Sequence, residues 1–160
     1  MSATAMPAGC YTLDTVEAVA RSWQEQGRTV FTNGCFDLLH VGHLRYLQAA
    51  RALGDRLVVG LNSDASVRGL KGPERPLVTE LERAELLLGL ACVDAIVIFD
   101  EPTAEGAIRV IRPAVYAKGG DYRPETLPET PAVLEGGGEV VILPFVEGRS
   151  TSALVARMKA

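Results

Sequence analysis

Short apolar runs, rich in β-branched and aromatic residues, recur along the chain with amphipathic stretches between them. Runs of this length and composition are typical of buried strands. We predict strands at 29–32, 56–61, 95–99, 114–118 and 139–143. Strands that alternate with helices build a parallel sheet covered on both faces, with right-handed crossovers. The pattern therefore predicts one three-layer α/β domain around a five-stranded parallel sheet.

Capping residues indicate where the helices between these strands begin. The segments 14–17 and 79–82 have capping-box spacing at the start of amphipathic stretches. The predicted helices span 14–27, 42–53, 103–111 and 150–158, with a further helix that begins at 79. Glycine and proline interrupt the polar sequence of 65–78 and 121–138. We therefore expect a loop over the first segment, and over the second an irregular insertion that contains one helical turn.

Composition excludes several classes of protein. A chain of 160 residues is long enough for one domain with a buried core but too short for two. A net charge of −4 argues against a broad nucleic-acid or membrane surface, because such partners select basic faces. No apolar run approaches the roughly 20 residues of a membrane span, and the N-terminus lacks a signal-peptide pattern.

The termini and cysteines complete the domain assignment. We expect a flexible N-terminal tail over 1–10 and the functional domain over 11–160. Three widely spaced cysteines, Cys10, Cys35 and Cys92, fit free thiols better than a disulfide framework. The expected location is the reducing cytoplasm.

Polar segments follow the strands at the positions where α/β proteins bind ligands. The segments are 33–43, 62–75, 118–121 and 147–152. Ligands of open parallel sheets bind outside the carboxyl ends of the strands, where the strand order reverses. We therefore expect these four segments to converge on one crevice.

The only two histidines, His40 and His43, lie three residues apart at the start of a predicted helix. Both rings can then face one ligand, and the helix N-terminus offers unpaired N–H groups that attract phosphate. Gly42 leaves room for a phosphate at the backbone. The helix dipole lowers histidine pKa, so we expect at least one neutral ring. Two alternatives are surface histidines and a zinc site with Cys35, although no second Cys/His cluster supplies further ligands.

A second phosphate site is predicted at the last helix. Ser150 or Thr151 can cap that helix, and Arg149 precedes it. A helix N-terminus disfavours a cation, and a bound anion would resolve the conflict. A simple cap explains the hydroxyl residues but not the arginine. The chain has no P-loop and no G-x-G-x-x-G motif, so P-loop phosphoryl transfer and dinucleotide binding are not indicated.

The segment TNGCFDLLHVGH, residues 32–43, resembles the signature of the HxGH nucleotidyltransferases, a family that includes the glycerol-phosphate cytidylyltransferases. The similarity continues through GLNSD, Lys71, LERAELL, KGGDY and VEGRSTS, and covers nearly the whole chain from about Gly27. The last two segments most resemble the adenylyltransferase domain of bacterial ADP-heptose synthases, which act on D-glycero-β-D-manno-heptose 1-phosphate. The resemblance implies a Rossmann-like fold.

This resemblance also implies the reaction and its residues. AMP would pass from ATP to a sugar 1-phosphate by direct in-line attack on the α-phosphate, with release of pyrophosphate. The implied catalytic residues are His40, His43, Lys71 and Arg149. The implied nucleotide-binding residues are Cys35, Phe36, His40, Gly42, His43, Lys71, Gly119, Glu147, Gly148, Arg149, Ser150 and Thr151. The implied acceptor-binding residues are Asp37, Arg83, Lys118 and Asp121.

Some of these roles have alternatives. Asp37 would orient its loop or contact acceptor hydroxyls, and Arg83 would reach the crevice or pair with a neighbouring glutamate at the surface. Lys71 is expected in a mobile loop. A reactive role for Cys35 has little support, because no paired base is evident. Mg²⁺ is expected to arrive with the triphosphate, held by phosphate oxygens and water without a dedicated protein site.

Other functions stay open. CTP or GTP could be the donor, and another polyol or sugar phosphate could be the acceptor. The glycerol-phosphate cytidylyltransferases carry a basic residue before their last motif, where this chain has Phe145-Val146. A non-catalytic nucleotide-binding module is the alternative from another class. No sugar kinase precedes the domain, so a stand-alone transferase is expected, and a homodimer is an option because relatives in the family are commonly dimers.

Overall fold

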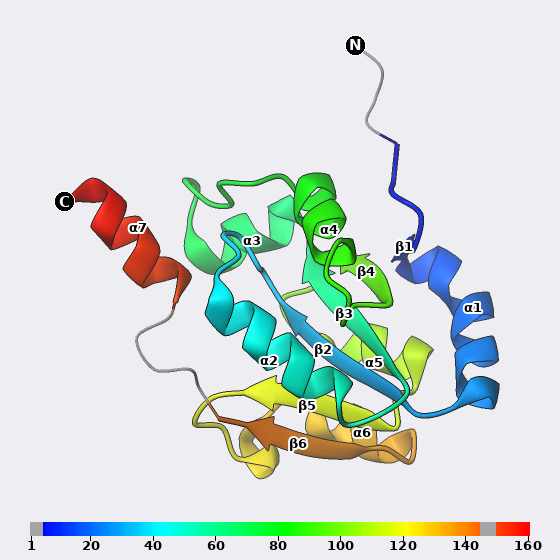
Figure 1. Ribbon diagram of the computed structural model, residues 1–160. Helices are drawn as coiled ribbons and strands as arrows, with labels where there is room; N and C mark the ends of the chain where they lie inside the picture. Colours follow the sequence, from blue (N-terminus) through cyan, green and yellow to red (C-terminus); the bar gives the residue numbers. More distant parts are fainter. Residues whose placement is uncertain (1–4, 145–149) are drawn as a thin grey trace.

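Buried strands, apolar on both faces, form the centre of the fold. In the computed structural model, which describes residues 5–144 and 150–160, six parallel strands form one sheet in the order β1-β4-β3-β2-β5-β6 (Figure 1). The strands are β1 (Cys10–Thr12), β2 (Thr29–Gly34), β3 (Arg56–Asn62), β4 (Ala95–Phe99), β5 (Val115–Gly119) and β6 (Glu139–Leu143). Strand β3 lies inside the sheet, and each of its residues from Leu57 to Asn62 is buried.

The side chains on the two faces of the sheet build two apolar cores. Phe31 and Val58 pack on one face with residues of α1, α5 and α6, and Val30 and Val59 pack on the other with residues of α2 and α4. The helices are α1 (Leu13–Gln26), α2 (Val41–Arg51), α3 (Asp64–Lys71), α4 (Glu80–Leu88), α5 (Glu105–Ile111), α6 (Thr130–Glu135) and α7 (Thr151–Lys159), with a 3-10 turn η1 (Pro124–Thr126). The predicted three-layer α/β arrangement is confirmed (Figure 1).

The predicted number of strands is wrong, because the sheet has six strands and not five. The additional strand β1 pairs with β4, with Cys10 opposite Ile96. Three residues are too few to produce a periodic pattern, so only the pairing defines this strand. Cys10 is buried in it, although the predicted flexible tail extends to this residue. Residues 1–4 of that tail lie outside the described residues.

The segment 65–78 is not a loop throughout, because its first half belongs to α3. The Ser63 hydroxyl accepts a hydrogen bond from the Ser66 amide at 3.2 Å and caps this helix, and Val67 is fully buried beneath it. The helix ends at Lys71, and Gly72 follows it as the C-cap with a φ of +103°, which favours glycine. Lys71 is therefore the last residue of a helix and not part of a loop. The insertion 121–138 likewise contains both η1 and α6.

Gly60 on β3 tests how tightly the sheet packs. A Cβ at this position would lie 2.5 Å from Phe31 Cζ and 3.2 Å from Asn33 Cβ. Gly60→Ala should therefore lower the free energy of unfolding by about 1–3 kcal/mol, measured by urea denaturation. The control is Gly69→Ala in α3, where no atom outside the local helix backbone lies within 4 Å of the new methyl group. This change should raise stability by about 0.5–1 kcal/mol. A Gly60→Ala protein as stable as the wild type would contradict the described packing.

Candidate active site

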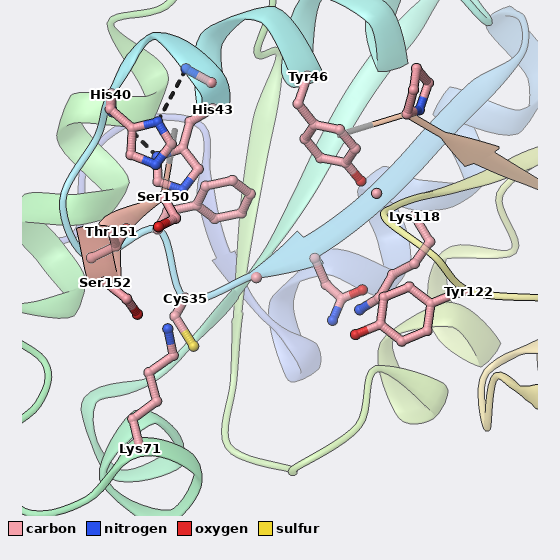
Figure 2. Close-up of a pocket in the computed structure, with 16 residues that line it drawn as sticks. Cys35, His40, His43, Tyr46, Lys71, Lys118, Tyr122, Ser150, Thr151 and Ser152 are labelled. Carbon is pink, nitrogen blue, oxygen red and sulfur yellow. Dashed lines mark hydrogen bonds between the residues drawn. The ribbon is translucent and has the colours of Figure 1, made fainter. Parts of the chain in front are cut away.

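A pocket of about 380 Å³ lies at the carboxyl edge of the sheet. The ends of β2 and β5, the starts of α2 and α7, and the end of α3 all contribute to it (Figure 2). Its lining residues are Asn33, Gly34, Cys35, Phe36, His40, Gly42, His43, Tyr46, Lys71, Lys118, Gly119, Tyr122, Pro144, Ser150, Thr151 and Ser152. Each of the four polar segments expected to converge thus contributes described residues to this lining.

The two histidines are held by the first turn of α2. His40 Nδ1 accepts a hydrogen bond from the Gly42 amide at 3.1 Å, and His43 Nδ1 accepts one from the His40 amide at 3.3 Å. The rings stack with centroids 3.9 Å apart (Figure 2). Because both Nδ1 atoms accept backbone N–H groups, each neutral ring carries its proton on Nε2. The backbone therefore sets the tautomer of both rings.

His43 is held in its neutral form. Burial, then the nearby His40, then Lys71 lower the pKa of His43 from 6.5 to about 4. The Phe36 ring packs edge-on against it, with centroids 5.3 Å apart. At neutral pH this ring is a hydrogen-bond donor through Nε2 and carries no charge.

Cys35 and Lys71 lie together on the side of the pocket nearest α3 (Figure 2). Burial raises the pKa of the Cys35 thiol, and the charge of Lys71 only partly opposes that effect. The thiol is therefore protonated at neutral pH, which argues against a nucleophilic role. Lys71 supplies a positive charge at this side of the pocket.

Asp37 has a structural position next to the pocket. Its buried carboxylate accepts hydrogen bonds from Arg75 Nε at 2.6 Å, the Leu77 amide at 2.8 Å and the Val78 amide at 3.0 Å. Burial alone would raise the pKa of Asp37, but these hydrogen bonds hold it below its ordinary value. These hydrogen bonds tie Asp37 to the segment after α3. It does not line the pocket, and its oxygens are already engaged.

Arg83 occupies neither of the positions expected for it. The side chain is fully buried and does not line the pocket, so it is not a surface ion pair. Its guanidinium donates to Val78 O, Cys35 O, Asn62 O and Asp64 Oδ1. These bonds join the ends of β2 and β3 to α3 and α4. The acceptor-binding assignment is therefore corrected to a structural one, because all three guanidinium nitrogens already have protein partners.

The remaining predicted residues divide into three groups. Lys118 and Gly119 line the pocket, whereas Asp121 is exposed and does not. Ser150 caps α7 by accepting from the Ala153 amide at 3.0 Å, and Thr151 Oγ1 donates to Leu38 O at 3.3 Å. The predicted contacts of Glu147, Gly148 and Arg149 lie outside the described residues.

Several lining residues were not among the predicted ones. Asn33 and Gly34 belong to the signature segment, and Tyr122 to KGGDY, but none had a predicted role. Tyr46 lies three residues after His43, so helical spacing could have placed it on the pocket face of α2. Its hydroxyl donates to Ala117 O at 3.0 Å, and burial raises its pKa to about 12. Tyr46 therefore stays protonated and ties α2 to β5.

Two broader features of the described residues bear on function. No three His, Cys, Asp or Glu side chains gather there into a potential metal site. None of the helices in that part of the chain is both long and apolar enough to span a membrane.

The state of His43 can be measured directly. We expect its imidazole to titrate near pH 4 in a two-dimensional NMR titration, with the neutral ring protonated on Nε2. Unfolded chains bind this proton near pH 6.5, so the contribution of the neutral ring to stability is full above that pH and falls as the pH drops toward 4. His43→Gln should flatten this dependence. A titration near pH 6.5 would contradict the desolvated, neutral ring.

Comparison with known proteins identifies the family. Residues 31–135 match the family described as cytidylyltransferase-like. The chain is 53% identical over 148 residues to the bifunctional protein HldE of Geotalea uraniireducens, covering 92% of this chain and 30% of that protein. It is 55% identical over 136 residues to the HldE of Syntrophotalea carbinolica, a match that covers 84% of this chain and 28% of that protein. The chain thus spans less than a third of these curated relatives.

A solved structure has the same fold. The lipopolysaccharide core biosynthesis protein from Thermoplasma volcanium matches with a TM-score of 0.62 and 26% identity, over 77% of this chain and 99% of that one. The family match covers more than half of the chain and includes the histidine pair at the start of α2. The chain therefore belongs to the cytidylyltransferase-like family, in agreement with the resemblance of its HVGH segment to the HxGH nucleotidyltransferases.

Proposed function

We propose that this chain transfers AMP from ATP to a heptose 1-phosphate and releases pyrophosphate. The observation that carries the proposal is the stacked pair of His40 and His43, which faces the pocket together with Lys71 and the start of α7. The bifunctional HldE relatives and the resemblance to ADP-heptose synthases support the choice of substrates. The named role of the Thermoplasma relative, lipopolysaccharide core biosynthesis, is consistent with it. We place this activity in the cytoplasm.

The pocket suits a polyphosphate. The N-termini of α2 and α7 both open into it, and each presents backbone N–H groups and the positive end of a helix dipole. Lys71 and Lys118 add positive charge from two sides. A chain with a net charge of −4 can therefore bind a polyanion through this local arrangement.

The chemistry follows from this arrangement. A phosphate oxygen of the acceptor attacks the α-phosphorus of ATP, the bond from that phosphorus to the bridging oxygen breaks, and pyrophosphate leaves. The attacking oxygen is already anionic, so no general base is required. Neutral His43 donates from Nε2 to a phosphate oxygen as negative charge develops, and Lys71 provides a fixed positive charge. Catalysis then consists of positioning and charge stabilisation.

Mg²⁺ fits this site only as a companion of the triphosphate. The carboxylate of Asp37 is engaged by Arg75 and two backbone amides, so it has no free oxygen for a metal. Phosphate oxygens and water would hold the ion. When bound, it would neutralise part of the phosphate charge.

The first test is the reaction itself. The protein is incubated with Mg²⁺, each of ATP, CTP and GTP, and a panel of sugar and polyol phosphates, and pyrophosphate release is measured. Release should be fastest with ATP and heptose 1-phosphate. Release only with CTP and glycerol 3-phosphate would replace the proposed substrates. Binding without release for every pair would favour the non-catalytic module.

The second test removes one histidine. His43→Ala should lower kcat at least about a hundredfold, because a donor to the developing charge is lost. Gln48→Ala, on an exposed position of the same helix, is the matched control and should retain wild-type kcat. Circular dichroism and urea denaturation establish whether both variants fold. A folded His43→Ala protein with full activity would refute the role of this ring.

A further inference from the structure

The pocket has a second side, away from the two histidines. Figure 2 shows Lys118, Tyr122 and Tyr46 across the pocket from His40 and His43. Asn33, at the end of β2, also lines the pocket. Asn33 takes no part in the transfer chemistry that we propose for the histidines.

A buried tyrosine holds the Asn33 side chain. Phe31 and Tyr116 are paired across β2 and β5, and their rings stack with centroids 6.1 Å apart. Tyr116 is fully buried, and its hydroxyl donates to Asn33 Oδ1 at 2.5 Å. Burial, and next the charge of Glu129, raise the pKa of Tyr116, so the hydroxyl stays protonated. Tyr116 thus engages the amide oxygen of Asn33 from inside the protein.

This hydrogen bond leaves Asn33 only its side-chain N–H groups for a ligand. With Oδ1 occupied, Asn33 can offer its Nδ2 group as a donor, and no hydrogen bond found between described residues uses that group. Gly60, paired with Asn33 in the neighbouring strand, lacks a Cβ and lets Asn33 Cβ and the Phe31 ring pack closely against it. The side chain of Asn33 is therefore fixed at its base by β3 and at its oxygen by β5.

The surroundings of Asn33 add a cation. Lys118 follows Tyr116 by two residues on β5, and its Nζ lies 5.2 Å from the centre of the Tyr122 ring. Both Lys118 and Tyr122 line the same pocket as Asn33. The second side of the pocket therefore combines a directed neutral donor with a positive charge.

We propose that Asn33 Nδ2 binds an uncharged oxygen or nitrogen acceptor of a substrate and that Tyr116 is its positioning residue. This inference rests on the proposed function. A hydroxyl of the sugar phosphate and an acceptor atom of the nucleoside share the required chemistry. Lys118 attracts a phosphate by charge alone, whereas the fixed amide imposes a direction. Asn33 is thus a determinant of substrate specificity.

Equilibrium binding measurements test the roles of Asn33 and Tyr116 without requiring turnover. Calorimetry measures ATP and heptose 1-phosphate separately on the wild type, Asn33→Ala, Tyr116→Phe and the double variant. Asn33→Ala should weaken one of the two ligands about three- to tenfold and leave the other unchanged. Tyr116→Phe should weaken the same ligand, and should add nothing in the Asn33→Ala background. The ligand affected identifies the source of the acceptor atom.

The control is Tyr11→Phe, which removes a hydroxyl from a tyrosine that packs on Trp23 and does not line the pocket. It should bind both ligands as the wild type does. Unchanged binding in Asn33→Ala, equal weakening of both ligands, or an effect of Tyr116→Phe that persists in the double variant would overturn the inference. Failure of the proposed function can be distinguished from failure of this inference, because the wild type would then release no pyrophosphate.

Discussion

Strand β2 has β3 on one side and β5 on the other, and this central position determines where the polar segments meet. The chain proceeds from β2 to β3 and β4 in one direction and later to β5 and β6 in the other. The strand order therefore reverses at β2, which is the point where α/β sheets bind ligands. The loop after β2 leads directly into α2, so both histidines stand at that point.

Buried polar groups then fix the loops around this point. Asp37 holds the segment after α3, and Arg83 joins the ends of β2 and β3. Each would be costly to bury without partners, and each has several. Two charged side chains that do not line the pocket therefore connect the segments around it. Burial also sets the protonation of two further side chains: it keeps His43 neutral and the Tyr116 hydroxyl protonated.

The features that could be predicted from the sequence are those that repeat or have a strong local signal. Alternating strands and helices indicate the layers, and HVGH indicates the start of α2. Strand β1 escapes prediction because its three residues are defined by pairing with β4. Helix α3 escapes it because it has only eight residues and contains a glycine, so the sequence resembles a loop. The position of Arg83 depends on four partners, three of which lie 19 to 48 residues away in the sequence. That of Asn33 depends on Tyr116, 83 residues away.

The fate of the α-phosphate of ATP tests nucleotidyl transfer most directly. ATP labelled with ³²P at either the α- or the γ-phosphate is incubated with the protein, Mg²⁺ and heptose 1-phosphate, and the labelled products are separated. We expect the α-label in the sugar nucleotide and the γ-label in pyrophosphate. Transfer of the γ-label to the sugar, or retention of both labels in ATP, would contradict nucleotidyl transfer at this site.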